Sequence, residues 1–130
     1  MPIKVLLADS NDAARRAIRN RLEHQAEIEL VAEATNIAQT IQLAKDLESQ
    51  VIVMDLHMPD ESTFASADLE LTLNHGASPI VAVSVWIDEE TRALADRFGA
   101  VTLLDKMELA TDLIPAIAQF TSSRTNPAVD

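Results

Sequence analysis

Short apolar runs alternate with amphipathic segments about five times along the chain. The runs are rich in β-branched residues and almost wholly apolar, as expected for parallel strands that are covered on both faces. They lie at Ile3–Ala8, Ile28–Glu33, Val51–Met54, Pro79–Ser84 and Val101–Leu104. The pattern therefore predicts five strands buried within one sheet.

Between and after these runs, apolar residues recur at three- or four-residue spacing, which predicts a helix after each strand. The apolar faces of the five helices begin at Ala14, Ile37, Phe64, Leu94 and Leu109. Asn36 is suited to cap the second helix and Gly76 to end the third. The acids at positions 88–90 are suited to the start of the fourth helix, and Gly99 to its end.

The last helix contains Pro115, which cannot donate a helical hydrogen bond. A helix that began at Glu108 would have this proline in its interior, so we expect a loose or kinked first turn and regular helix from about Asp112. The chain then becomes rich in Ser, Thr, Asn and Pro. We expect a domain over residues 1–121, with 122–130 a flexible tail or the start of a linker.

Five strand–helix units predict an α/β fold, a doubly wound five-stranded parallel sheet with helices on both faces. Right-handed crossovers leave few topologies, and the flavodoxin-like strand order 2-1-3-4-5 places the ends of strands 1 and 3 side by side. Asp9 and Asp55, each directly after a strand, then become neighbours.

The composition narrows the classes of function. The chain has 130 residues, which suits one domain, and a net charge of −11, which argues against binding to nucleic acid or anionic membranes. It has no cysteine, which excludes thiolate catalysis, disulfides and cysteine zinc sites, and two glycines, too few for a Gly-rich phosphate loop. Without a signal peptide or an apolar run near the roughly 18 residues of a membrane span, a soluble cytoplasmic protein is expected.

Polar side chains stand at the carboxyl ends of four predicted strands, where open α/β sheets bind ligands. They are Asp9, Asp55, Ser84 and Lys106. A carboxylate can attack a phosphoryl group when a cation and preset donors offset the charge repulsion. The set therefore predicts metal-assisted phosphoryl transfer to Asp55.

Each residue has a role in that chemistry. Asp9, Asp55 and the backbone carbonyl of His57 are candidate oxygen ligands for Mg²⁺. The Ser84 hydroxyl can donate to a phosphoryl oxygen, and Lys106 can pair with the phosphoryl group, or with Asp55 before transfer. Singly, such residues are more often helix caps, polar strand ends or solvated lysines, so the specificity lies in the joint pattern.

On these residues the sequence resembles the receiver domains of bacterial two-component response regulators. The resemblance covers about residues 3–121, and its opening third is most similar to receivers attached to helix-turn-helix output domains. It is carried by the segments Ile3–Asp9, Val51–Pro59, Ile80–Ser84, Phe98–Ala100 and Leu103–Lys106. It implies that Asp55 is the phosphoacceptor, Asp9 an acid of the metal site, Ser84 the switch hydroxyl and Lys106 the active-site lysine.

The sequence departs from the receiver pattern at three places. Ser10 stands where receivers carry a second acid that contacts the metal, so weak Mg²⁺ binding is expected. Ser62 and Thr63 replace the usual Asp-Gly pair. Leu103 replaces the aromatic switch residue of strand 5, so a rotating ring linked to Ser84 cannot transmit the signal.

The resemblance also implies partners. They are a sensor histidine kinase or histidine phosphotransfer protein as phosphoryl donor, with a small phosphodonor as the alternative, and a downstream output domain or protein. A homodimer through helix 4, strand 5 and helix 5 is implied as well. No nucleic acid, membrane or enzymatic substrate is expected for this chain beyond its own phosphorylation and dephosphorylation.

Three alternatives to a phosphoacceptor remain. A phosphorylation-independent receiver that acts as an interaction module is favoured by the three departures at Ser10, Ser62-Thr63 and Leu103. A phosphatase of the haloacid dehalogenase type also uses an Asp at a strand end, but it requires a second Asp where His57 stands. A flavodoxin would need glycine in the loop that begins at Asp9, which has none.

The first predicted helix is the only basic stretch of an acidic chain, and it carries Arg15, Arg16, Arg19 and Arg21. It is either a solvated face in which Asp12 caps the helix and pairs with Arg16, or a docking surface for an acidic partner. Trp86, two positions after Ser84, is either partly buried against the fourth helix or a lid or docking contact. His57 is expected to act as a gate beside Asp55.

Overall fold

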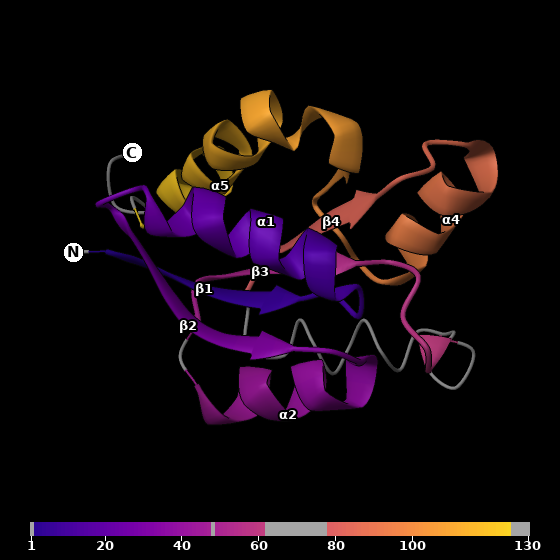
Figure 1. Ribbon diagram of the computed structural model, residues 1–130, viewed down its shortest axis with the longest axis horizontal. Coiled ribbons are helices and arrows are strands. Elements are labelled where there is room, and N and C mark those ends of the chain that lie inside the picture. The colour runs from indigo at the N-terminus through magenta and orange to yellow at the C-terminus, as the bar shows by residue number, and fades with distance from the viewer. Residues whose placement is uncertain (1, 48, 62–77, 126–130) are drawn as a thin grey trace.

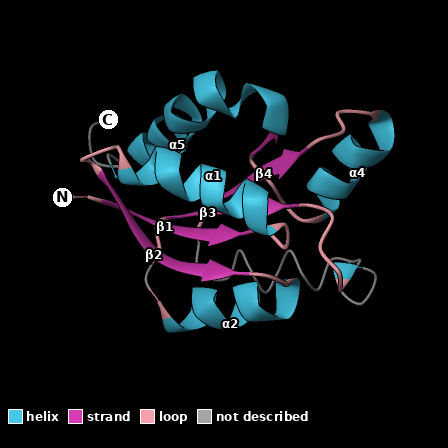
Figure 2. Cartoon of the chain, in the orientation of Figure 1, coloured by secondary structure: helices cyan, strands magenta, loops and turns pink. Residues whose placement is uncertain are grey.

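A five-stranded parallel sheet forms the centre of the computed structural model, which describes residues 2–47, 49–61 and 78–125 (Figures 1 and 2). The strand order is β2-β1-β3-β4-β5, which confirms the predicted order. The strands are β1 (Ile3–Ala8), β2 (Ile28–Ala34), β3 (Val51–Asp55), β4 (Ile80–Ser84) and β5 (Thr102–Asp105). Each boundary lies within one residue of its predicted position.

Helices cover both faces of the sheet, because successive strand residues point to opposite sides. On one side, α1 (Asp12–Glu23) and α5 (Leu109–Thr125) pack against a cluster that includes Val53. On the other side, α2 (Ile37–Asp46) and α4 (Glu89–Arg97) pack against a cluster that includes Met54 (Figure 1). All residues of β3 and β4 are buried, which explains their wholly apolar sequences apart from the last residue of each.

The predicted caps are confirmed for two helices and corrected for a third. Asn36 Oδ1 accepts a hydrogen bond from the amide of Gln39 at 2.7 Å, and Asp88 caps α4. Gly99 follows α4 with φ of 76°, a conformation that glycine adopts without steric cost. In α1 the cap is Asn11 and not Asp12, which lies inside the first turn.

The last helix begins earlier than predicted. A 3₁₀ turn, η2 (Lys106–Glu108), matches the expected irregular start, but the α-helix begins at Leu109 and not near Asp112. Leu109 is buried in the cluster against α1, and this apolar contact outweighs the one hydrogen bond that Pro115 cannot make. The helix also continues to Thr125, past residue 121, where we expected the domain to end.

Part of the predicted chain lies outside the described residues. This applies to the third predicted helix, from Phe64 to Gly76, to Ser62 and Thr63, and to the end of the expected tail. In the described ranges, each helix is too short or too polar to cross a membrane.

Candidate functional site

The strand register brings the four predicted site residues to one edge of the sheet. Asp55 pairs with Val83 at the end of β3, and Ser84 pairs with Asp105 at the end of β4. Asp9 directly follows β1, which lies beside β3, and Lys106 directly follows β5. The carboxyl ends of four parallel strands therefore place these side chains in one region, as the sequence predicted.

The centre of the site is an ion triad. The ammonium of Lys106 lies 2.8 Å from Asp9 Oδ2 and 3.6 Å from Asp55 Oδ1. Asp9 is fully buried, Asp55 is 6% exposed, and the Lys106 side chain is 13% exposed. Two buried carboxylates thus share one cation, and the cation lies closer to Asp9.

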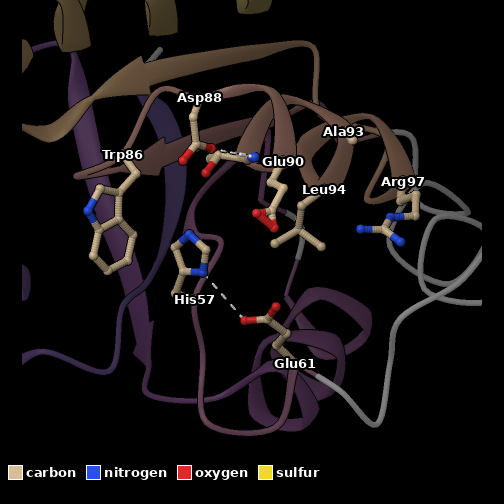
Figure 3. Close-up of a pocket in the computed structure, with 9 residues that line it drawn as sticks. His57, Glu61, Trp86, Asp88, Glu90, Ala93, Leu94 and Arg97 are labelled. Atoms are coloured by element: carbon tan, nitrogen blue, oxygen red, sulfur yellow. Dashed lines mark hydrogen bonds and ion pairs between the residues drawn. The ribbon is translucent and has the colours of Figure 1, made fainter.

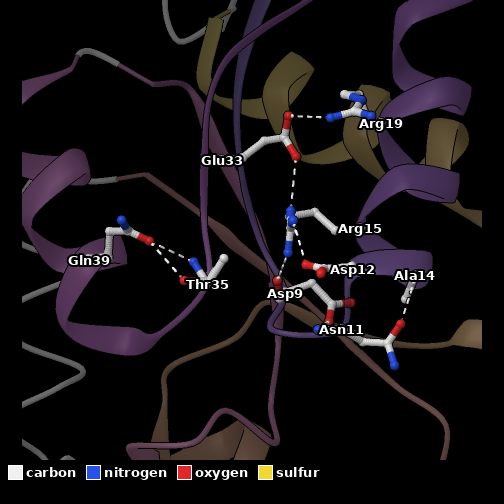
Figure 4. Close-up of polar contacts among 9 residues, drawn as sticks. All are labelled: Asp9, Asn11, Asp12, Ala14, Arg15, Arg19, Glu33, Thr35 and Gln39. Carbon is white, nitrogen blue, oxygen red and sulfur yellow. Dashed lines mark hydrogen bonds and ion pairs between the residues drawn. The ribbon is translucent and has the colours of Figure 1, made fainter.

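Asp9 is held at both its backbone and its side chain. Its amide donates to the carbonyl of Ala34 at 3.0 Å, and its own carbonyl accepts from Arg15 Nη1 at 2.9 Å (Figure 4). Its Oδ1 accepts from the amide of Asn11 at 2.9 Å. Its Oδ2 faces Lys106 and accepts no well-formed hydrogen bond from the described residues. One oxygen of a fully buried carboxylate is therefore directed into the site.

Arg15 links this loop to β2 and α1. Besides the carbonyl of Asp9, its guanidinium contacts Glu33 at 3.1 Å and Asp12 at 2.7 Å (Figure 4). Hydrogen bonds to Asp12 and then to Glu33, with the charges of both carboxylates, raise the pKa of Arg15 against its partial burial. Arg19 also binds Glu33, at 3.1 Å.

The predicted pair of Asp12 with Arg16 is therefore wrong. Asp12 pairs with Arg15 at i+3, because the Arg15 side chain turns toward β2, where Glu33 adds a second carboxylate. Of the four arginines of α1, Arg15 and Arg19 serve this internal network. Arg16 and Arg21 are exposed, and docking of an acidic partner on them remains a prediction.

The environment of Asp55 works against its ionised form. Burial is the largest influence and raises the pKa of the Asp55 carboxyl. The Lys106 ammonium opposes this rise, the charge of Asp9 adds to it, and a hydrogen bond from the backbone of His57 opposes it. Because the net effect is a raised pKa, further positive charge beside Asp55 would stabilise its ionised form.

Ser84 is fully buried at the end of β4. Its Oγ accepts a hydrogen bond from the amide of Trp86 at 3.0 Å, which fixes the oxygen in place. A serine hydroxyl keeps its own proton to donate when it accepts such a bond. The geometry therefore leaves Ser84 equipped as a donor to an incoming anion.

His57 and Trp86 form the rim of a neighbouring pocket. Their rings meet edge to face, with centroids 5.2 Å apart and planes at 80° (Figure 3). His57 Nδ1 lies 3.6 Å from Glu61, and these residues line a pocket of about 330 Å³ beside α4. Trp86 is 58% exposed, so its indole stands beside His57 with more than half of its surface open to solvent.

Asp60 is a residue whose position the sequence analysis missed. Its carboxylate accepts hydrogen bonds from the amides of Ile37 and Ala38, at 2.8 Å and 3.0 Å. These amides are 23 and 22 positions away in the sequence, so no local spacing rule could indicate the contact. The acid after Pro59 therefore joins the loop that follows Asp55 to the first turn of α2.

Comparison with known proteins identifies the family. The sequence profile of the response regulator receiver domain matches residues 5–118. The nitrate/nitrite response regulator protein NarL of Escherichia coli K12 is 31% identical over 118 residues, which cover 91% of this chain and 54% of that protein. A protein-glutamate methylesterase/protein-glutamine glutaminase of Carboxydothermus hydrogenoformans is 30% identical over 107 residues, which cover 82% of this chain and 27% of that protein.

Solved structures show the same fold. The signal receiver domain of the putative response regulator NarL from Mycobacterium tuberculosis superposes with a TM-score of 0.81 at 20% identity, covering 95% of this chain and 98% of that one. The response regulator domain of Thermotoga maritima CheB gives 0.78 at 22%, covering 94% and 98%. The chain spans about half or less of the two curated relatives named above. It belongs to the response regulator receiver domain family of two-component systems.

Proposed function

We propose that Asp55 accepts a phosphoryl group in a Mg²⁺-dependent step and that the phosphorylated domain changes its affinity for a partner. The observation that carries this proposal is the buried arrangement in which Lys106 lies within 2.8 Å of Asp9 and 3.6 Å of Asp55. The buried hydroxyl of Ser84 at the end of the adjacent strand supports it. This is a nucleophile, a cation and a donor at one edge of the sheet.

The proposed step is a displacement at phosphorus. A carboxylate oxygen of Asp55 forms the new P–O bond. The bond from phosphorus to the histidine nitrogen or acyl oxygen of the donor breaks, and the leaving atom keeps the electron pair. Lys106 offsets the charge of the phosphoryl oxygens, and the Ser84 hydroxyl donates to one of them.

The residues present fit Mg²⁺, but sparsely. Among the described residues, no group of three or more His, Asp or Glu side chains could hold a metal. Mg²⁺ binds through as few as one or two carboxylates with waters and phosphate, and the inward Oδ2 of Asp9 fits that use. Asp9, Asp55 and the His57 carbonyl would hold the ion, with Ser10 a weak fourth position. When bound, Mg²⁺ supplies positive charge to the phosphoryl oxygens.

The partners follow the family. We propose a sensor histidine kinase or a histidine phosphotransfer protein as donor in the cytoplasm, and an output domain or protein as receiver of the signal. A homodimer through α4, β5 and α5 is proposed with it. Because Leu103 occupies the position of the aromatic switch residue, transmission on this face would depend on backbone and packing changes.

The test is phosphorylation by acetyl phosphate with Mg²⁺, followed by intact mass and Trp86 fluorescence. The parent is expected to gain one phosphoryl group, while Asp55→Asn, which lacks the nucleophile, gains none. A folded parent that gains no phosphoryl mass at high Mg²⁺ would reject the proposal.

A phosphorylation-independent interaction module is the second candidate. It is favoured by Ser10 and by the closer approach of Lys106 to Asp9, because a lysine engaged by Asp9 is less available to a phosphoryl group on Asp55. Under this alternative, neither the parent nor Asp55→Asn gains mass, and both bind the same partner equally.

A further inference from the structure

The loop from Leu56 to Glu61 carries the backbone carbonyl that the proposed function assigns to Mg²⁺. Two apolar side chains, Leu56 and Met58, anchor the loop in the core. Its backbone makes a 3.3 Å hydrogen bond from the amide of Leu56 to Val83, a local 3.1 Å bond from the amide of Glu61 to Met58, and a bond from His57 to the Asp55 carboxylate at the near end of the loop. Apolar packing is non-directional, so it does not fix where a carbonyl points.

Among the described residues, the directional contact that ties the far end of this loop to another element of the fold is the carboxylate of Asp60. Oδ1 accepts from the amide of Ile37 at 2.8 Å, and Oδ2 accepts from the amide of Ala38 at 3.0 Å. Bonds to an ionised carboxylate are short and about twice as strong as neutral ones, and the start of a helix favours negative charge. Ile37 is itself fully buried, so the loop is attached to a fixed part of the fold.

Helix α2 does not depend on Asp60 alone. Asn36 caps the amide of Gln39 at 2.7 Å, and its carbonyl accepts from the amide of Thr40 at 3.1 Å. Asn36 and Asp60 therefore divide the free amides of the first turn between them. Asn36 serves only the helix, whereas Asp60 joins the helix to the phosphoacceptor loop.

We infer that Asp60 is a positioning residue: by its two bonds to α2 it sets the loop on which the His57 carbonyl meets Mg²⁺. This inference rests on the proposed function. It assigns to α2, which contributes no group to the ion triad, a part in the metal affinity of the site.

Asn36→Ala is the matched control for Asp60→Ala, because both remove a side-chain acceptor from the same helix end and only one touches the loop. Mg²⁺ affinity is measured by calorimetric titration and stability by urea unfolding. Asp60→Ala is expected to weaken Mg²⁺ affinity by about tenfold or more, as loss of an outer support of a metal ligand does. Asn36→Ala is expected to lower stability and leave Mg²⁺ affinity unchanged. Asp60→Asn, which keeps an amide oxygen as acceptor, is expected to restore part of the affinity.

Hydrogen exchange gives a second reading that needs no metal. The amide of Glu61 is expected to exchange faster in Asp60→Ala than in Asn36→Ala. Equal Mg²⁺ affinity in Asp60→Ala and parent would overturn the inference and leave Asp60 a simple cap. If the parent protein neither binds Mg²⁺ nor accepts a phosphoryl group, that result rejects the proposed function and this inference with it, before any variant is compared.

Discussion

Replacement of Lys106 by methionine tests how strongly the two buried acids depend on their shared cation. The change removes the ammonium that lies 2.8 Å from Asp9 and 3.6 Å from Asp55 and leaves a side chain of similar length. Breaking a buried ion pair by removing one partner leaves an uncompensated charge and is strongly destabilising. Here two carboxylates lose their cation at once.

The distances set the size of the effect. At an effective dielectric constant of about 20, the attractions amount to about 6 kcal/mol at 2.8 Å and about 5 kcal/mol at 3.6 Å. The net loss is smaller, because one carboxyl can take a proton instead. Protonating an aspartate of ordinary pKa costs about 4 kcal/mol at pH 7 and about 1.5 kcal/mol at pH 5. Asp55 takes that proton, since burial already raises its pKa.

Urea unfolding of parent and Lys106→Met at pH 7 and pH 5 measures this prediction. The variant is expected to lose up to about 4 kcal/mol at pH 7 and less than half of that at pH 5. Lys45→Met, which changes an exposed lysine of α2, is expected to stay within about 0.5 kcal/mol of the parent at both values. A loss in Lys106→Met that is the same at both pH values would refute the reasoning, because it would show that the acids do not take up a proton.

Three further changes test other parts of the structure. The raised pKa of Asp55 means that the folded state binds the Asp55 proton more tightly than the unfolded state, so stability falls as pH rises through the folded pKa. Asp55→Asn cannot ionise and is therefore expected to be more stable than the parent at pH 7, by about 0.5–2 kcal/mol in urea unfolding. The difference is expected to vanish below about pH 4. Arg15→Gln is expected to lower the free energy of unfolding by about 1.5–3 kcal/mol, because the charged hydrogen bonds of Arg15 to Asp9, Asp12 and Glu33 are lost. The same change at the exposed Arg16 is expected to stay within about 0.5 kcal/mol of the parent, and equal losses in the two variants would contradict the assigned network. Gly99→Ala is expected to cost about 1–2 kcal/mol by thermal unfolding because of its φ of 76°, and an unchanged melting temperature would count against that strain.

The sheet could be predicted from the sequence because its strands are buried on both faces. A strand such as Val51–Asp55 has no solvent-facing side, so it appears as a continuous apolar run with a turn on either side. Right-handed crossovers then restrict the order of the strands. The proximity of Asp9 and Asp55 follows from that order alone, so the sequence was enough to place the two strand ends side by side.

The pairing of side chains from different helices, strands and loops could not be predicted in the same way. Spacing along a helix offered Arg16 as the partner of Asp12, but Glu33 on β2 draws Arg15 into the network instead. The contact of Asp60 with α2 likewise depends on how two distant segments approach each other. Such contacts depend on tertiary packing. In an acidic chain, local sequence does not distinguish which of the many carboxylates will pair with a given arginine or amide.

The last helix shows a local rule that yields to packing. Pro115 predicted a late start, because a proline inside a helix removes a hydrogen bond. The buried side chains of Leu109 and Leu113 hold the preceding turn against the sheet, so the helix begins before the proline. Sequence rules for helix ends consider individual hydrogen bonds, whereas the start of this helix is determined by the burial of apolar side chains.

The ion triad also bears on how the chain folds. Its three members lie at the carboxyl ends of β1, β3 and β5, so the site assembles only when strands from both halves of the chain have paired in the sheet. Pairing of distant parallel strands is slow, because the entropy of loop closure is spent before the contacts form. A folding route that joins β1 to β3 before β5 arrives brings two acids together without their cation. We therefore expect an electrostatic cost on that route, which a route with early pairing of β5 would avoid.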